Sequence, residues 1–229
     1  MLSLAFDCSS RALAVALVAN EALLGQVLVT VKKNHSINLM PTIDYLFDAC
    51  SVDKTDLDRI VVAQGPGSYT GLRIAVATAK TLAYALSCEL VGVSSLQALT
   101  DETDMGVQIA VIDARRQAVY AGVYQGGKTL VEEAYRPMSE VIELAKIYDH
   151  VTFVGEVSTF EKMIKEALPQ AKTVVRYPDA YLMTKFAEAI QPSDVDSFVP
   201  NYLKRVEAEE NWLKNHGSDS DESQYIKRI

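Results

Sequence analysis

The sequence predicts a duplicated α/β protein with two copies of one unit, in which three antiparallel strands are followed by a helix, a strand and a helix (βββαβα). Each half of the chain opens with three apolar or alternating runs separated by turn-like residues, which is typical of an antiparallel meander. Helical spacing and short apolar runs then alternate in the same order in both halves. The first hairpins also align without a gap, which places Phe6-Asp7 over Ile112-Asp113.

The first half carries the clearer element signals. Its first helix repeats apolar residues at helical spacing, and Pro41 is tolerated there only in the first turn or as a kink. A short apolar run then enters a glycine-rich loop, which predicts a buried parallel strand followed by an alanine-rich helix. The expected elements are strands 2–6, 12–18 and 23–31, helix 38–50, strand 59–63, helix 72–86 and strand 90–93.

The second half repeats this order and ends in a polar segment. Its expected elements are strands 107–112, 118–124 and 129–135, helix 140–148, strand 151–154, helix 159–168, strand 173–176 and helix 182–190. A further helix is expected over 206–214, but residues 217–223 are polar and acidic, as in mobile tails. We therefore expect an N-terminal lobe (1–98), a C-terminal lobe (99–212) and a tail (213–229).

The composition excludes several classes of protein. A chain of 229 residues that is 49% hydrophobic can bury a large core. No stretch approaches the ~20 apolar residues that cross a bilayer, and the three cysteines have no CxxC spacing. We therefore expect a cytoplasmic protein without membrane association. A net charge of −8 argues against tight, direct binding to nucleic acid by this chain alone.

The loop between strand 59–63 and helix 72–86 is the strongest candidate site. Its three glycines and one proline indicate backbone turns, and a loop that opens a helix leaves amide N–H groups free to meet an anion. No Gly-Lys-Ser/Thr follows, so this is not a Walker loop. A tight turn without a ligand is the alternative. We expect Gly65, Pro66, Gly71 and Arg73 to shape the loop, with Arg73 bonded to carbonyls or a carboxylate.

Two such units describe the architecture of actin, Hsp70 and sugar kinases, with a nucleotide in the cleft between them. Enzymes of this kind use strand-end aspartates to hold magnesium and orient water, which makes Asp7 and Asp113 candidates. Both can equally start turns. In the second half the counterpart of the glycine loop reads VGEVS, and a carboxylate at Glu156 would repel a phosphate. We therefore expect no catalytic residue.

The string GPGSYTGLRIA over residues 65–75 resembles the signature of the TsaB (YeaZ) family, and further matches cover residues 7–10, 35–36, 113–115 and 200–203. That family is the non-catalytic paralogue of TsaD in the bacterial synthesis of threonylcarbamoyladenosine in tRNA. The resemblance implies a subunit that binds and activates a TsaD-type catalytic subunit. The product is a threonylcarbamoyl group on N6 of adenosine 37, in tRNAs that read codons beginning with adenine.

The resemblance also has consequences for metals, cofactors and partners. TsaD binds a metal through a His-x-x-x-His pair, whereas His35 is followed four residues later by Leu39, so no metal site is expected. The family implies a TsaE-type ATPase as second partner, a homodimer when the chain is alone, and tRNA contact only through the complex. It implies no cofactor required by this chain itself. ATP or ADP at the partner interface would lie near Asp7, Gly67, Ser68, Tyr69 and Thr70.

In the family, the two helices of the first domain form the partner interface. The second helix here is rich in small residues, which permits close approach of another helix and equally permits tight packing on its own sheet. The expected partner-binding residues are Leu39, Ile43, Phe47, Ile74, Ala77, Thr78, Thr81 and Ala85.

Other functions remain open at this stage. One is an active nucleotide-hydrolysing enzyme of the same fold, another is a glycoprotease-like peptidase, and a third is a self-contained homodimeric scaffold unrelated to tRNA. The sequence does not fix the angle between the two lobes, which decides how far the cleft is open.

Overall fold

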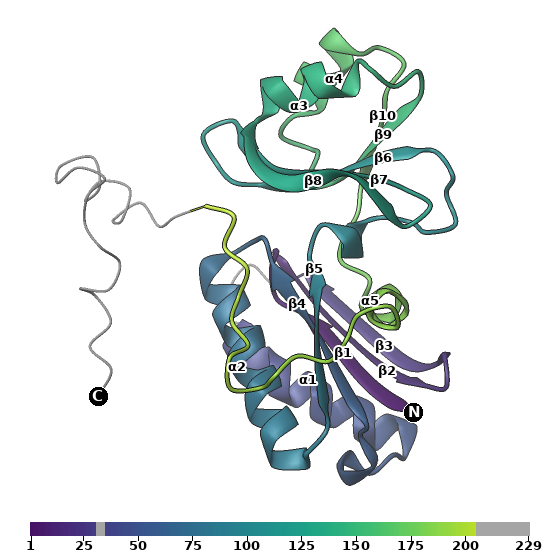
Figure 1. Cartoon of the computed structure of the whole chain (residues 1–229), viewed down its shortest axis with the longest axis vertical. Helices are drawn as coiled ribbons and strands as arrows, with labels where there is room; N and C mark the ends of the chain where they lie inside the picture. Colours follow the sequence, from purple (N-terminus) through teal and green to yellow (C-terminus); the bar gives the residue numbers. More distant parts are fainter. Residues whose placement is uncertain (31–34, 205–229) are drawn as a thin grey trace, which may run out of the picture.

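The computed structural model describes residues 1–30 and 35–204 and forms two lobes, each built on one five-stranded sheet (Figure 1). Every strand and helix expected between residues 2 and 190 is present, with ends displaced by a few residues. The duplicated α/β fold is therefore confirmed. None of the helices in the described ranges is long and apolar enough to span a bilayer.

The first lobe contains a mixed sheet in the order β3-β2-β1-β4-β5. The first three strands pair antiparallel, whereas β4 pairs in parallel with β1 and β5 in parallel with β4, with helices in the connections. Helices α1 and α2 cover one face of this sheet (Figure 1). The elements are β1 (Leu2–Asp7), β2 (Ala12–Ala19), β3 (Ala22–Thr30), α1 (His35–Cys50), η1 (Lys54–Asp56), β4 (Arg59–Gly65), α2 (Tyr69–Leu86) and β5 (Glu89–Ser94).

The second sheet has the order β8-β7-β6-β9-β10, which matches that of the first strand for strand. The short 3-10 helix η2 (Gln97–Leu99) lies in the connection between the two lobes. Helices α3 and α4 pack on one face of this sheet (Figure 1). The elements are β6 (Val107–Asp113), β7 (Ala118–Gln125), β8 (Lys128–Pro137), α3 (Met138–Ala145), β9 (Val151–Gly155), α4 (Glu161–Ala167) and β10 (Lys172–Val175).

Helix α5 (Ala180–Ala187) returns to the first lobe, although we expected it in the second. Its residues Ala180, Met183 and Ala187 are buried together with Ala5 and Ala14 on the face of the first sheet that α1 and α2 leave open. The expected C-terminal lobe, residues 99–212, is therefore corrected to the sheet and helices between β6 and β10. The expected tail 213–229 and the helix 206–214 lie outside the described residues.

The structure also corrects the gap-free alignment of the two halves. Phe6 packs against the helices of the first lobe and Val111 against those of the second, so these two residues are equivalent. Ile112 faces the opposite side of its sheet. Asp113 therefore lies one position beyond the equivalent of Asp7. In β1 the residues Leu2, Leu4 and Phe6 face the helices, as Val107, Ile109 and Val111 do in β6. This alternation is visible in the sequence, and aligning the two aspartates instead places the strands one residue out of register.

Candidate functional site

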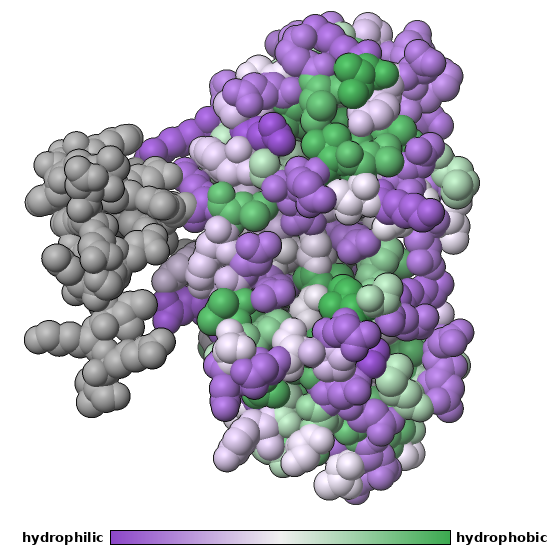
Figure 2. Space-filling model, viewed as in Figure 1, coloured by the Kyte–Doolittle hydropathy of each residue, from purple (hydrophilic) through white to green (hydrophobic). Residues whose placement is uncertain are grey.

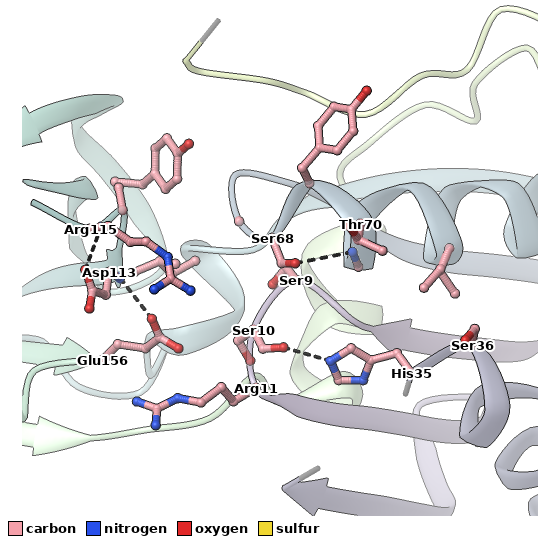
Figure 3. A pocket seen from close by; sticks show the side chains of 17 residues that line it. Ser9, Ser10, Arg11, His35, Ser36, Ser68, Thr70, Asp113, Arg115 and Glu156 are labelled. Atoms are coloured by element: carbon pink, nitrogen blue, oxygen red, sulfur yellow. Dashed lines mark hydrogen bonds between the residues drawn. The ribbon is translucent and has the colours of Figure 1, made fainter. Parts of the chain in front are cut away.

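A pocket of about 980 Å³ lies between the two lobes (Figure 3). The first lobe supplies the β1–β2 turn (residues 9–11), the start of α1, and the glycine loop with the first turns of α2. The second lobe supplies residues 112–115, Tyr120 and Glu156. A second pocket of about 400 Å³ shares Arg11, Asp113 and Glu156 with the first. Both lobes therefore meet at one continuous cleft.

The glycine loop lies directly on the β1–β2 turn. The Ser68 amide donates a 2.7 Å hydrogen bond to the Ser9 carbonyl, and the Ser68 side chain caps α2 by accepting a hydrogen bond from the Gly71 amide. A Cβ added to Gly67 would lie 2.5 Å from the Ser9 oxygen, and one on Gly71 would lie 1.9 Å from the oxygen of Cys8. Only glycine fits at these two positions because backbone occupies the space of a side chain.

The segment that carries residues 200–203 covers the other side of the loop. Gly65 has a φ of +126°, and a Cβ there would lie 2.4 Å from the Asn201 oxygen. The Asn201 amide donates to the Gln64 carbonyl over 2.8 Å. The Gly65-Pro66 peptide bond is cis. Sequence motifs some 130 residues apart therefore form one structural unit around the start of α2.

Arg73 does not make the contact that we expected. Its guanidinium donates a 2.6 Å hydrogen bond to the hydroxyl of Tyr69, one helical turn away, rather than to a carbonyl or carboxylate. The Tyr69 ring in turn stacks on Tyr202, with ring centroids 5.1 Å apart. Arg73 thus contributes to an exposed aromatic cluster beside the glycine loop.

Asp7 is fully buried at the end of β1, directly behind the pocket wall. One carboxylate oxygen accepts a hydrogen bond from the Ser9 amide, and the other has no partner among the described residues. Burial raises the pKa of Asp7 to about 6, although the hydrogen bond from the Ser9 amide acts in the opposite direction. The Ser9 hydroxyl and His35 Nδ1 are also buried without a partner in the described part of the chain. Three buried polar atoms without a hydrogen-bond partner in the described residues therefore lie at this corner of the cleft.

The residues expected near a nucleotide separate into two groups. Gly67, Ser68, Tyr69 and Thr70 line the pocket, whereas Asp7 lies behind Ser9 and does not reach the pocket surface. The start of the 18-residue helix α2 therefore faces the pocket with the positive end of its dipole.

The second lobe presents a carboxylate at the corresponding place. Glu156 Oε2 accepts a 2.9 Å hydrogen bond from the Asp113 amide, and the Asp113 carboxylate accepts one from the Arg115 amide (Figure 3). Burial raises the pKa of Glu156, and the nearby Arg11 and Arg115 partly offset this effect. The Asp113 amide, which could otherwise face a phosphate, is already bonded to a protein carboxylate. The cleft therefore resembles an anion site on one side only.

His35 lies at the mouth of the pocket, where its Nε2 is 2.9 Å from the Ser10 carbonyl. Within residues 1–30 and 35–204 there is no group of three or more His, Cys, Asp or Glu side chains that could hold a metal ion.

Three of the expected partner-binding residues are buried. Leu39, Ile43 and Phe47 are only 1–2% exposed because they pack against the first sheet. Their helical spacing marks the inner face of α1, so their assignment to a partner surface is corrected. Sequence reasoning missed the exposed apolar residues of α1: Ile37, Met40 and Tyr45.

The residues expected on α2 lie on its outer side. Its inner face, with Leu72, Ala75 and Ala79, packs on the sheet. Tyr84, which is 80% exposed, adds a large apolar surface to the outer face. Figure 2 shows apolar patches on both lobes, each bordered by hydrophilic side chains. The expected partner-binding residues on α2 are all at least partly exposed: Ile74, Ala77, Thr78, Thr81 and Ala85.

Two duplicated lobes with the strand order 3-2-1-4-5, joined around a polar cleft, define a protein of the actin-like ATPase fold. Residues 23–212 match the family model described as TsaD: tRNA N6-adenosine threonylcarbamoyltransferase. The tRNA threonylcarbamoyladenosine biosynthesis protein TsaB of Bacillus subtilis (strain 168) is 35% identical in an alignment 230 residues long, gaps included. The alignment covers 94% of this chain and 99% of that protein. The chain therefore belongs to the TsaB (YeaZ) family, within the wider family that the TsaD model describes.

A solved structure agrees with this assignment. YeaZ from Pseudomonas aeruginosa is 27% identical, has a TM-score of 0.74, and covers 88% of this chain and 99% of its own. The TsaB protein of Escherichia coli (strain K12) is 29% identical over 126 residues, about half of each chain. The similarity thus extends over both lobes.

Proposed function

We propose that this protein takes part in the synthesis of threonylcarbamoyladenosine in tRNA as a non-catalytic subunit that binds and activates a TsaD-type subunit in the cytoplasm. Family membership supports the pathway, because relatives are named for it. The main support for the subunit role is the exposed outer face of the 18-residue helix α2. The small residues Ala77, Thr81 and Ala85 lie on this face together with the exposed Tyr84. Small residues allow a partner helix to approach closely.

The same surface would allow the protein to pair with itself when the TsaD-type subunit is absent. The net charge of −8 supports contact with tRNA through the complex rather than directly. A TsaE-type ATPase is the second partner that we propose.

Replacing Ala77 with arginine is expected to weaken pairing with the TsaD-type subunit at least ~100-fold, because an unpaired charge at the centre of an interface is costly. Ala77 is exposed, so the fold should persist. Isothermal titration calorimetry and size-exclusion chromatography with the purified partner measure the effect. Thr81→Arg should act alike, and Ala167→Arg, at an exposed alanine of α4 in the second lobe, is the matched control. Full affinity in both helix variants would show that another face binds.

We further propose that ATP or ADP contacts the glycine loop without being hydrolysed by this chain alone. The start of α2 and the unpartnered Ser9 hydroxyl favour a phosphate on the first lobe, whereas Glu156 opposes one on the second.

The nucleotide proposal predicts no measurable hydrolysis of ATP by this chain alone. Pure protein mixed with Mg²⁺-ATP should release no phosphate above the rate of a denatured sample in a continuous phosphate assay. Fast release that is lost in Asp7→Asn would instead favour the active nucleotide-hydrolysing enzyme. A peptidase is disfavoured, because the His35 ring contacts a backbone carbonyl rather than a serine or cysteine side chain.

A further inference from the structure

The two lobes are joined near the crossover by a partly buried hydrogen-bond network centred on Glu133 of β8. Its carboxylate oxygen Oε1 accepts hydrogen bonds from the Tyr124 hydroxyl of the same lobe, over 2.5 Å, and from the hydroxyl of Ser94, at the end of β5 in the first lobe. The Ser94 hydroxyl also accepts from the amides of Leu96 and Gln97, over 3.0 and 3.1 Å. One carboxylate thus connects the second sheet, the first sheet and the linker.

The linker itself is shared between the lobes. Leu96 and Leu99 pack in a cluster with Ala110 and Tyr124 of the second lobe. Ala98, between them, packs in the cluster that joins the first sheet to α5. A change in lobe angle must therefore bend the chain around η2, next to the Ser94–Glu133 hydrogen bond, and also at the return connection 176–179, where the Asp179 amide bonds to the Ala98 carbonyl.

A second contact holds the same strand two residues further along. Lys204 Nζ lies 4.4 Å from the centroid of the Tyr135 ring and 3.3 Å from its hydroxyl. Lys204 follows residues that are fixed to the first lobe, because Tyr202 stacks on Tyr69 and the Asn201 amide bonds to β4. Strand β8 is therefore attached to the first lobe at two separate points.

Glu133 is the costlier of these two contacts to break. Burial raises the pKa of its carboxyl group, whereas the hydrogen bonds from Ser94 and Tyr124 lower it. A rotation of the lobes that separates Ser94 from Glu133 would remove one of these hydrogen bonds from a partly buried acid. The polar group would then lose a partner while it remains poorly hydrated, which is unfavourable.

We propose that Glu133 and Tyr135 form a latch on β8 that holds the two lobes at the observed angle and thereby fixes the opening of the cleft. Elements that pack as rigid bodies around a short linker move by hinge rotation, and specific contacts beside the hinge select one angle. Loss of the Glu133 contact is expected to release a range of angles.

The test measures the distance between the lobes in the full chain. Cysteines for spin labels replace Ala49 on α1 and Lys162 on α4, both exposed, in a background with Cys50→Ser and Cys88→Ser. Pulsed electron paramagnetic resonance then gives the distance distribution. Glu133→Ala should broaden this distribution and shift it to longer distances. Glu133→Gln, which keeps the accepting oxygen, should leave it close to that of the unmodified background.

The matched control is Glu132→Ala, which removes the exposed neighbouring carboxylate on the same strand. A distribution for Glu133→Ala that superimposes on the background would overturn the latch, and so would equal broadening in Glu132→Ala. If Glu133→Ala does not fold, Lys204→Met removes the second contact at the surface and should also broaden the distribution. An unchanged distribution in that variant would likewise overturn the proposal.

Discussion

Replacement of Gly71 by alanine is expected to destabilise the protein by at least about 3 kcal/mol or to prevent folding, although alanine is the better helix former. Gly71 lies in the first turn of α2, and its new Cβ would lie 1.9 Å from the carbonyl oxygen of Cys8. That oxygen belongs to backbone beside the β1–β2 turn and cannot rotate away. The helix and the turn would have to separate, which would break the Ser68–Ser9 hydrogen bond.

Urea unfolding followed by circular dichroism measures this effect. The control is Gly106→Ala, where the closest contact of the new Cβ is the side-chain oxygen of Asp104 at 3.0 Å, which can move aside. The sign of the change is informative. If the loop could adapt, the helix propensity of alanine would stabilise α2 by up to ~1 kcal/mol. A Gly71→Ala protein as stable as the unmodified chain would mean that the glycine loop is not held against the turn.

The sequence predicts the order and type of the elements well, because periodicity reports which residues face a core. It misleads where Asp7 is aligned with Asp113, although the alternation of larger apolar residues in β1 and β6 indicates the correct register. It also fails to place α5. A helix with one apolar face only indicates that it packs on a sheet, and both sheets were available.

The candidate site shows the same division. The glycine loop was recognisable because its glycines stand where neighbouring backbone lies too close for a side chain. The partner surface was partly misassigned because Leu39, Ile43 and Phe47 have the apolar spacing that marks a core face. A single helix does not reveal which of its apolar residues meet its own sheet. The contact of Lys204 with Tyr135 joins residues far apart in the chain, and no local pattern indicates it.

Asp7→Asn is expected to make the protein more stable by about 3 kcal/mol at neutral pH and to leave stability below pH 3.8 nearly unchanged. Burial raises the pKa of Asp7 from 3.8 to about 6, so the folded state holds this proton more tightly than the unfolded state does. The free energy of unfolding then falls as the pH rises from 3.8 to about 6 and stays lower above that range. Each unit of pKa difference corresponds to about 1.4 kcal/mol.

Urea unfolding of both proteins at several pH values tests this expectation. Asparagine keeps an oxygen that can accept the hydrogen bond from the Ser9 amide but has no ionisable proton, so the difference in stability should appear between pH 3.8 and about 6. A difference in the free energy of unfolding that does not vary with pH would show that ionisation of Asp7 does not destabilise the folded state. A carboxylate that destabilises the fold at neutral pH is not explained by stability, and because Asp7 lies behind Ser9, we expect any effect of Asp7 on binding to act through that residue. Loss of ADP affinity in the more stable Asp7→Asn protein would separate these two roles, because a merely structural residue would not weaken binding while strengthening the fold.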